Sequence, residues 1–155
     1  MSEESTAPRE PAYFEEIRIG SEYEVGRYTP SKQEIVDFAR RWDPQPFHID
    51  EAAAAASVFG GLSASSCHTY AISSLIFSRS DRKLHTAAML GMEVKFPHPV
   101  RPDEELVLIE TMVAKRESRS RPDVGIVTSR GALRNPRGED VMATESSYLV
   151  LRRPR

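Results

Sequence analysis

Hydrophobic and polar residues alternate along residues 23–29, a pattern typical of a strand with one buried face. After Pro30 the apolar residues change to helical spacing, which predicts a helix over residues 32–41. Ser31 is a suitable N-cap, and Glu34 completes a capping box three residues later. The apolar face of this helix is formed by Ile35, Val36, Phe38, Ala39 and Trp42.

Two prolines interrupt the helical pattern in residues 43–48. Because each proline lacks an N–H donor and restricts the residue before it, we expect a stiff loop here rather than a helix interior. Asp50 is a predicted cap for a second short helix through the alanines at 52–56, and Gly60-Gly61 then allows a sharp turn. A longer helix is predicted from about Ser65 to Ser78, since apolar and small residues recur there every three to four positions.

The second half of the chain has the pattern of strands. Residues 88–96, 106–114, 125–134 and 141–151 are each of strand length and contain β-branched or aromatic residues. Turn residues separate them, and Asn135-Pro136-Arg137-Gly138 predicts a hairpin. The order of elements predicts an α+β fold, with an antiparallel sheet wrapped against one main helix. We expect residues 1–12 to be a flexible tail and residues 13–155 to form one domain.

Composition narrows the class of protein. The 155 residues are 39% hydrophobic and 28% charged, which suits one globular domain. No apolar run reaches the ~20 residues of a membrane span, and the acidic, polar N-terminus does not resemble a signal peptide, so we expect a cytoplasmic protein without a membrane partner. A net charge of −2 argues against nucleic-acid binding through a basic face. The single cysteine, Cys67, excludes an intramolecular disulfide framework, and the histidines lack metal-ligand spacing, so no metal site is expected.

Asp43 and His48 are the strongest candidates for chemistry. They stand at the two ends of the proline-stiffened segment, which could hold a carboxylate and an imidazole on one point for general acid–base catalysis. The alternative is that Asp43 ends a helix and His48 is a hydrogen-bonded loop residue.

Two further segments have both a functional and a structural interpretation. The small residues Ser65 and Ser66 at the start of the long helix could leave backbone N–H groups free to stabilise a developing negative charge, although a turn with an N-cap serine explains them too. Arg119 and Arg121 could bind a phosphate or a carboxylate, although a solvated strand end has the same composition.

Four segments together resemble the MaoC-like dehydratase family, which includes the R-specific enoyl-CoA hydratases. The first matches a pattern of Phe-Ala, a spacer and Asp-x-Asn-Pro-x-His-x-Asp, with Gln45 in place of the asparagine. The second has Ser65-Ser66 where the better-studied hydratases have His-Gly. The segments are Phe38-Ala39 with Asp43 to Asp50, Phe59-Gly60-Gly61-Leu62 with Ala64-Ser65 and His68-Thr69, Phe96 to Asp103, and Ser118 to Asp123 with Gly125-Ile126-Val127.

This resemblance implies a hot dog fold and a homodimer, or a dimer of dimers, with sites at the subunit interface. It implies hydration of 2-enoyl thioesters, or the reverse dehydration, with Asp43 and His48 catalytic and a backbone amide at Ser65 or Ser66 as the oxyanion donor. Coenzyme A or an acyl carrier would be part of the substrate, with Arg119 and Arg121 as candidate contacts, and no separate cofactor is expected. Residues expected to bind substrate are Gln45, Phe47, Phe59, Gly61 and Leu62. Two alternatives remain open: a non-catalytic acyl-thioester-binding subunit or partner chain of a heterodimeric dehydratase, and a thioesterase.

Overall fold

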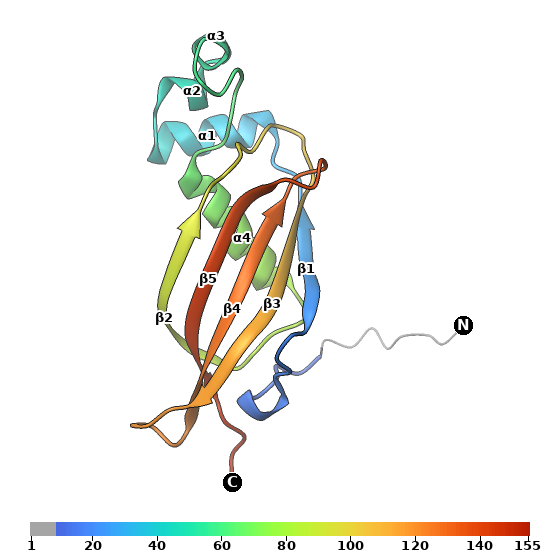
Figure 1. The fold of residues 1–155 in the computed structure, drawn as a ribbon. Helices are drawn as coiled ribbons and strands as arrows, with labels where there is room; N and C mark the ends of the chain where they lie inside the picture. The colour runs from blue at the N-terminus through green and yellow to red at the C-terminus, as the bar shows by residue number, and fades with distance from the viewer. Residues whose placement is uncertain (1–8) are drawn as a thin grey trace, which may run out of the picture.

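The computed structural model describes residues 9–155, which form one long central helix, several short helices and a single sheet (Figure 1). The helical elements are the 3₁₀ turn η1 (Phe14–Glu16), α1 (Lys32–Trp42), α2 (Pro46–Ile49), α3 (Glu51–Ala55) and α4 (Ser66–Arg79). The strands are β1 (Glu22–Tyr28), β2 (Thr86–Lys95), β3 (Leu106–Glu117), β4 (Val124–Arg134) and β5 (Asp140–Leu151).

The five strands form one antiparallel sheet in the order β1-β3-β4-β5-β2. The β4–β5 pair is a hairpin, and Gly138 adopts a positive φ of 77° in its turn, a conformation that glycine tolerates without strain. β1 and β2 are the two edges, so the first two strands of the chain flank the last three.

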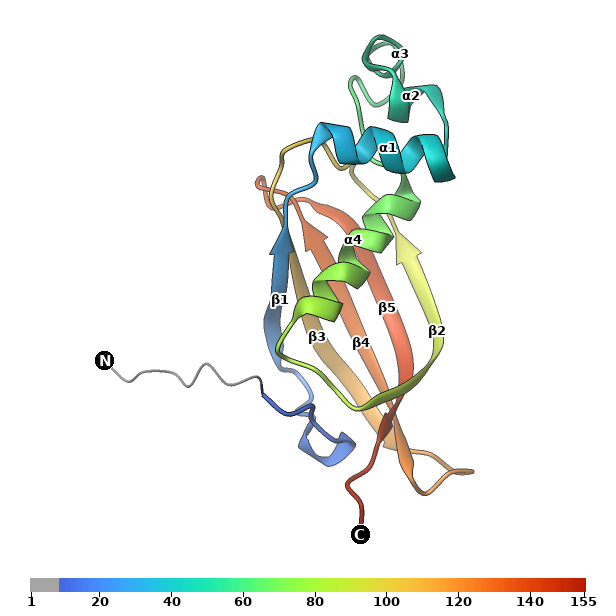
Figure 2. The ribbon, with the colours of Figure 1, turned by 180° about the vertical axis from the view of Figure 1, so that it is seen from behind.

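Helix α4 lies across one face of the sheet, and Figure 2 shows it running diagonally over the strands. Its Ile72 and Ile76 are buried in the main core, together with Leu106 and Leu108 of β3. β3 alternates between buried and partly exposed positions along its first half, as expected for a strand with one face toward a core. The sheet and α4 therefore share one hydrophobic core, and burial of these side chains is the main source of stability.

The short helices α1, α2 and α3 gather at the N-terminal end of α4, beyond one end of the sheet (Figure 1). The turn between β3 and β4 lies at the opposite end of the molecule. No helix in residues 9–155 is long and apolar enough to cross a membrane.

Most predicted elements are confirmed, and one is wrong. The capped helix after Ser31, the helix after Asp50, the long helix capped by Ser65 and the strands lie where the pattern places them, within a few residues. The expectation of a loop throughout residues 43–48 is wrong, because Pro46 is the first residue of α2, where a missing N–H leaves no hydrogen bond unmade.

The predicted tail is described only at its end. Residues 1–8 lie outside the described residues, while Ala12 forms a parallel bridge with Leu84. The backbone therefore joins the domain one residue before the expected boundary at 13.

Candidate active site

Asp43 and His48 lie side by side at the N-terminal end of α4. Asp43 ends α1, where its backbone N–H donates to Ala39 O at 2.8 Å, and His48 lies within α2. The Asp43 Oδ2 and His48 Nε2 atoms are 3.5 Å apart. His48 is buried, whereas the Asp43 side chain remains 28% exposed, so this pair can be reached from solvent through its carboxylate.

The backbone sets the tautomer of His48. Its Nδ1 atom lies 2.6 Å from the carbonyl oxygen of Ser63, and a carbonyl can only accept a hydrogen bond. Nδ1 therefore carries the proton, and Nε2 of the neutral ring is the acceptor that faces Asp43. A water molecule or an alcohol that lies against both groups can donate a proton to the imidazole while the carboxylate orients it.

Ser65 connects this pair to α4. Its Oγ donates to Asp43 Oδ2 at 2.7 Å and accepts from the backbone N–H of Cys67 at 3.2 Å. Ser65 is fully buried, so these contacts fix the Asp43 carboxylate relative to the start of the helix.

The same cap leaves donors at the helix start. Thr69 N donates to Ser65 O, and Cys67 N is taken by Ser65 Oγ, so within the described chain the amides of Ser66 and His68 lack acceptors in the first turn. Ser66 is exposed and His68 is buried, so the Ser66 amide is the better candidate for contact with a ligand. The N-terminus of a helix also carries partial positive charge.

Aromatic side chains surround His48. The Phe47 ring contacts His48 edge-on, with centroids 4.6 Å apart, and Phe59 lies 5.1 Å from Phe47. Leu62 is buried and Gly61 is partly exposed, whereas Gln45 is exposed and serves as the N-cap of α2 through its backbone. The structure thus brings Phe47 and Phe59 to the histidine, while Gln45 O accepts the backbone N–H of His48 at 2.9 Å.

Arg101 holds the glycine turn in place, a role that the sequence did not reveal. Its guanidinium donates to Gly61 O at 2.7 Å, to Leu62 O at 3.2 Å and to Phe59 O. These carbonyls belong to the segment that leads directly to Ser63 and Ser65. Arg101 therefore positions the backbone on which the His48 tautomer depends.

Replacing Arg101 with methionine is expected to lower the free energy of unfolding by about 1.5–3 kcal/mol, because hydrogen bonds from a charged donor are among the stronger ones. Urea denaturation measures this loss. The matched control is Arg130→Met, since Arg130 is 65% exposed and pairs with Glu145, an arrangement that contributes about 0–1 kcal/mol. Equal losses in both variants would contradict the role assigned to Arg101.

The structure does not bring Arg119 and Arg121 to this site. Both are exposed in the turn between β3 and β4, at the other end of the protomer (Figure 1), and Arg121 pairs with Asp123 at 2.6 Å. Their expected contact with a carrier stays a prediction.

His68 is buried rather than available as a ligand. It stacks on Phe38 with ring centroids 4.4 Å apart, and its Nε2 lies 3.4 Å from Glu34 Oε1. Burial lowers the pKa of this imidazole despite the neighbouring carboxylate. Across residues 9–155, no three His, Cys, Asp or Glu side chains come together as metal ligands would.

A buried carboxyl group, that of Glu110, is a second polar feature of the interior, and the alternation along β3 could have predicted it. Leu106, Leu108, Glu110 and Met112 occupy alternate, inward positions of β3, and a charged residue at such a position is the signal of a buried carboxyl group. Tyr23 OH donates to Glu110 Oε2 at 2.6 Å, and Ser129 Oγ donates to Oε1 at 2.7 Å. Burial raises the pKa of Glu110 above its ordinary value of 4.5.

Replacing Glu110 with glutamine is expected to stabilise the protein at neutral pH. Well below pH 4.5 the folded and unfolded wild type are both protonated at this position, so burial of the group carries no ionisation penalty. As the pH rises, the unfolded chain releases the proton first, and the wild type loses about 1.4 kcal/mol for each unit by which folding raises the pKa. Glutamine does not titrate and escapes this loss.

The measurement is the free energy of unfolding in urea, below pH 4.5 and at neutral pH. Glu93→Gln is the matched control, since Glu93 is 73% exposed on β2. A stability difference between wild type and Glu110→Gln that does not change with pH, as expected for the control, would refute the assignment.

Comparisons with known proteins agree with this architecture. Residues 14–131 match the family model described as a MaoC like domain. The protein YdeM of Bacillus subtilis is 31% identical over 142 residues, which cover 90% of this chain and 99% of that protein.

Two solved structures share the fold. The MaoC-like dehydratase from Rhodospirillum rubrum is 39% identical with a TM-score of 0.86, covering 93% of this chain and 99% of that one. The R-hydratase PhaJ1 from Pseudomonas aeruginosa is 21% identical with a TM-score of 0.72, covering 91% of this chain and 86% of that one. The family match, these likenesses and the antiparallel sheet around α4 establish that the chain belongs to the MaoC-like dehydratase family and has the hot dog fold.

Proposed function

We propose that this protein is a hydratase, or in reverse a dehydratase, that interconverts 2-enoyl and (R)-3-hydroxyacyl thioesters. The observation that supports this proposal most directly is the Asp43–His48 pair, with 3.5 Å between Oδ2 and Nε2 and with Nδ1 bonded to Ser63 O. A base and a carboxylate that face one point are what the addition of water to a double bond requires.

In the proposed hydration, Asp43 and His48 orient a water molecule against C3 of the enoyl group. His48 Nε2 takes one proton as the water oxygen forms its bond to C3, and the electron pair of the double bond moves toward the thioester. The resulting enolate takes a proton at C2 from the His48 imidazolium, which restores the neutral ring. Dehydration follows the same steps in reverse, so atoms and charge balance in both directions.

The thioester oxygen gains negative charge in the enolate. We place it at the start of α4, where the exposed Ser66 amide and the helix N-terminus can stabilise an anion. Phe47 and Phe59, beside His48, are proposed to contact the acyl group near the reacting carbons, together with Leu62 and Gly61 of the turn that Arg101 holds. Gln45 borders this region as an exposed residue.

We also propose that the protein acts as a homodimer. β2 is an edge of the sheet, and its Met89 and Leu90 are 55% and 54% exposed, so this edge is suited to burial against a second copy. A dimer of dimers would extend the same arrangement. The fold is shared with hydratases, and the R. rubrum relative is described as a dehydratase.

The test is an ultraviolet assay of enoyl-CoA hydration over a range of acyl chain lengths and branching, with chiral analysis of the 3-hydroxyacyl product. The expected result is loss of the enoyl absorbance for at least one substrate and formation of the R product. A thiol assay run in parallel detects thioester hydrolysis. Release of free thiol without hydration, or no reaction over the whole panel by a purified dimer, would contradict the proposal.

A further inference from the structure

The carboxylate and the oxyanion donor of the proposed site belong to two different helices. Asp43 ends α1, whereas Ser65 and Ser66 lie at the start of α4, and Figure 2 shows α1 against that end of α4. The Ser65 hydroxyl joins the two helices through Asp43 Oδ2. Because this hydrogen bond needs both helices in fixed positions, the packing between α1 and α4 decides where the carboxylate lies.

His68 packs against α1 about one helical turn after Ser65. Its ring stacks on that of Phe38, with centroids 4.4 Å apart and an angle of 7° between the planes, and its Nε2 lies 3.4 Å from Glu34 Oε1. Glu34 and Phe38 are four residues apart, so they share one face of α1. A single side chain of α4 therefore contacts two successive turns of the helix that ends at Asp43. These contacts of His68 with Phe38 and Glu34 are called the His68 clamp below.

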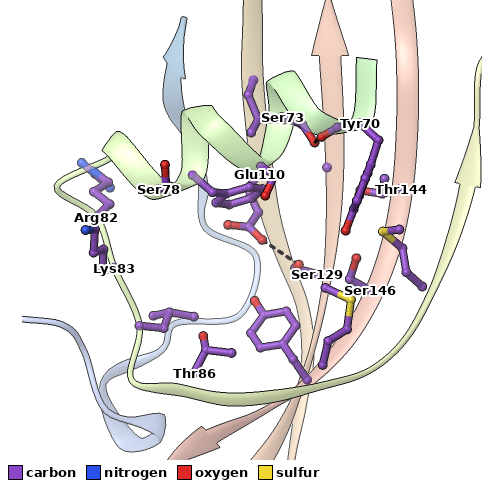
Figure 3. Close-up of a pocket in the computed structure, with 18 of the residues that line it drawn as sticks. Tyr70, Ser73, Ser78, Arg82, Lys83, Thr86, Glu110, Ser129, Thr144 and Ser146 are labelled. Atoms are coloured by element: carbon purple, nitrogen blue, oxygen red, sulfur yellow. Dashed lines mark hydrogen bonds between the residues drawn. The ribbon is translucent and has the colours of Figure 1, made fainter. Parts of the chain in front are cut away.

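His68 is a buried titratable group whose hydrogen bonding is incomplete, in contrast to Glu110. Both Glu110 oxygens accept hydrogen bonds, and Figure 3 shows the one from Ser129. His68 is 4% exposed, and within residues 9–155 its Nδ1 atom has no hydrogen-bonding partner. A neutral ring with its proton on Nε2, toward the Glu34 carboxylate, suits these surroundings. A second proton would lie on Nδ1, where a buried donor without an acceptor is costly.

The charged and titratable groups around His68 come from three elements. The Glu34 carboxylate of α1 is next to the ring, and Tyr28 of β1 donates to that carboxylate at 2.7 Å. Behind them, the Arg79 guanidinium of α4 lies 5.9 Å from the centre of the Tyr28 ring. The Glu34 charge favours a protonated ring, but burial outweighs it and lowers the pKa of His68 below its ordinary value of 6.5. The ring is therefore neutral at neutral pH.

We propose that His68 is a positioning residue for the Asp43–His48 pair, because its neutral ring holds α1, and with it the Asp43 carboxylate, against the start of α4. The effect of His68 on turnover rests on the proposed hydratase function. Its effect on the position of α1 does not, so the two can be measured separately.

Acid is expected to weaken the His68 clamp. When α1 moves away from α4, His68 regains contact with water and its ordinary pKa, so the open form binds a proton more readily than the closed form. The clamp therefore opens more easily as the pH falls below 6.5, whereas above that value its full strength is present.

Hydrogen exchange of the α1 amides tests the clamp on the full-length protein without substrate. His68→Ala removes the stacked ring and is expected to lower the protection of residues 32–42 about tenfold at neutral pH. His68→Phe keeps a flat ring against Phe38 and should retain wild-type protection. From neutral pH to about pH 5, the wild type should lose protection in α1 after correction for intrinsic exchange rates, because the open form binds a proton. His68→Phe should not, because phenylalanine does not titrate.

Ile76→Val is the matched control for packing on α4. Ile76 is also buried, but it packs on β1, where a Cβ atom at Gly26 would lie 2.9 Å from its Cγ2 atom. Its α1 protection should equal that of the wild type. Unchanged protection in His68→Ala, or an equal loss in Ile76→Val, would overturn the proposal. If His68→Ala does not fold, the pH comparison decides, and the same pH dependence in the wild type and His68→Phe would refute the clamp.

Steady-state kinetics on the best enoyl-CoA substrate separate positioning from a purely structural role. His68→Ala is expected to lower kcat about tenfold or more, because small displacements of a catalytic group are costly. KM should stay within about threefold, since the proposed acyl contacts Phe47 and Phe59 lie outside α1 and α4. His68→Phe should restore kcat. Wild-type kcat in His68→Ala would refute positioning while the hydratase proposal stands. A wild type without hydration activity would contradict the hydratase proposal, and hydrogen exchange alone would then decide on the clamp.

Discussion

Replacing His48 with alanine is expected to lower the rate of enoyl-thioester hydration by about 10²–10⁴-fold, the usual contribution of a general acid–base group. The imidazole Nε2 is the atom proposed to take the proton of the attacking water, and alanine leaves nothing in its place. Asp43→Asn is expected to lower the rate as well, while its amide oxygen can still accept the Ser65 hydroxyl. Steady-state kinetics on the best enoyl-CoA substrate measure both effects.

The control for the histidine variant is His98→Ala. His98 is exposed, and its Nε2 lies 3.4 Å from Glu139 Oε2, near the turn between β4 and β5. The activity of His98→Ala should match that of the wild type. His98→Ala, His48→Ala and Asp43→Asn should all unfold cooperatively on heating, as a folded protein does. Turnover close to the wild-type rate in both His48→Ala and Asp43→Asn would rule out the mechanism proposed for this pair.

Replacing Gly125 with alanine is expected to destabilise the fold by about 1–3 kcal/mol, as overpacking of a tight core does. A Cβ atom at position 125 would lie 2.2 Å from two ring atoms of Phe14, which is buried in η1 against β4. Phe14 or the strand must therefore move. Urea denaturation of the variant measures the loss of unfolding free energy.

Gly91→Ala on β2 is the matched control, because a Cβ atom there meets nothing within 4 Å. Its unfolding free energy should stay within about 0.5 kcal/mol of the wild type. In the double variant Phe14→Leu with Gly125→Ala, the smaller side chain should recover part of the loss, since contacting residues do not behave additively. Equal stabilities of Gly125→Ala and Gly91→Ala would show that Phe14 yields without strain.

The sequence predicted the elements whose pattern is local. The capping box at Ser31, the cap at Asp50 and the alternation in β3 each depend on residues within a few positions of one another, so their elements were found. The pattern does not predict α2, because proline breaks a helix at interior positions, whereas at the first helical position it is favoured. The sequence does not predict the exposure of the β2 side chains either, because this exposure depends on where α4 crosses the sheet.

The candidate site shows the same division. Asp43 and His48 are five positions apart, and this short spacing was enough to predict that their side chains converge on one point. The Ser63 carbonyl that sets the His48 tautomer is 15 residues away, and the Arg101 contact to Gly61 spans 40 residues. Contacts of that range depend on the path of the backbone, which no spacing of residue types specifies.

The contact between His48 Nδ1 and Ser63 has a consequence for how the site tolerates change. The acceptor is a main-chain oxygen, which every amino acid supplies, while the Ser63 hydroxyl itself is buried without a partner in residues 9–155. The His48 tautomer therefore depends on the backbone conformation at position 63 and not on the side chain there. A small residue such as alanine at position 63 is therefore expected to leave the proton on the same ring nitrogen.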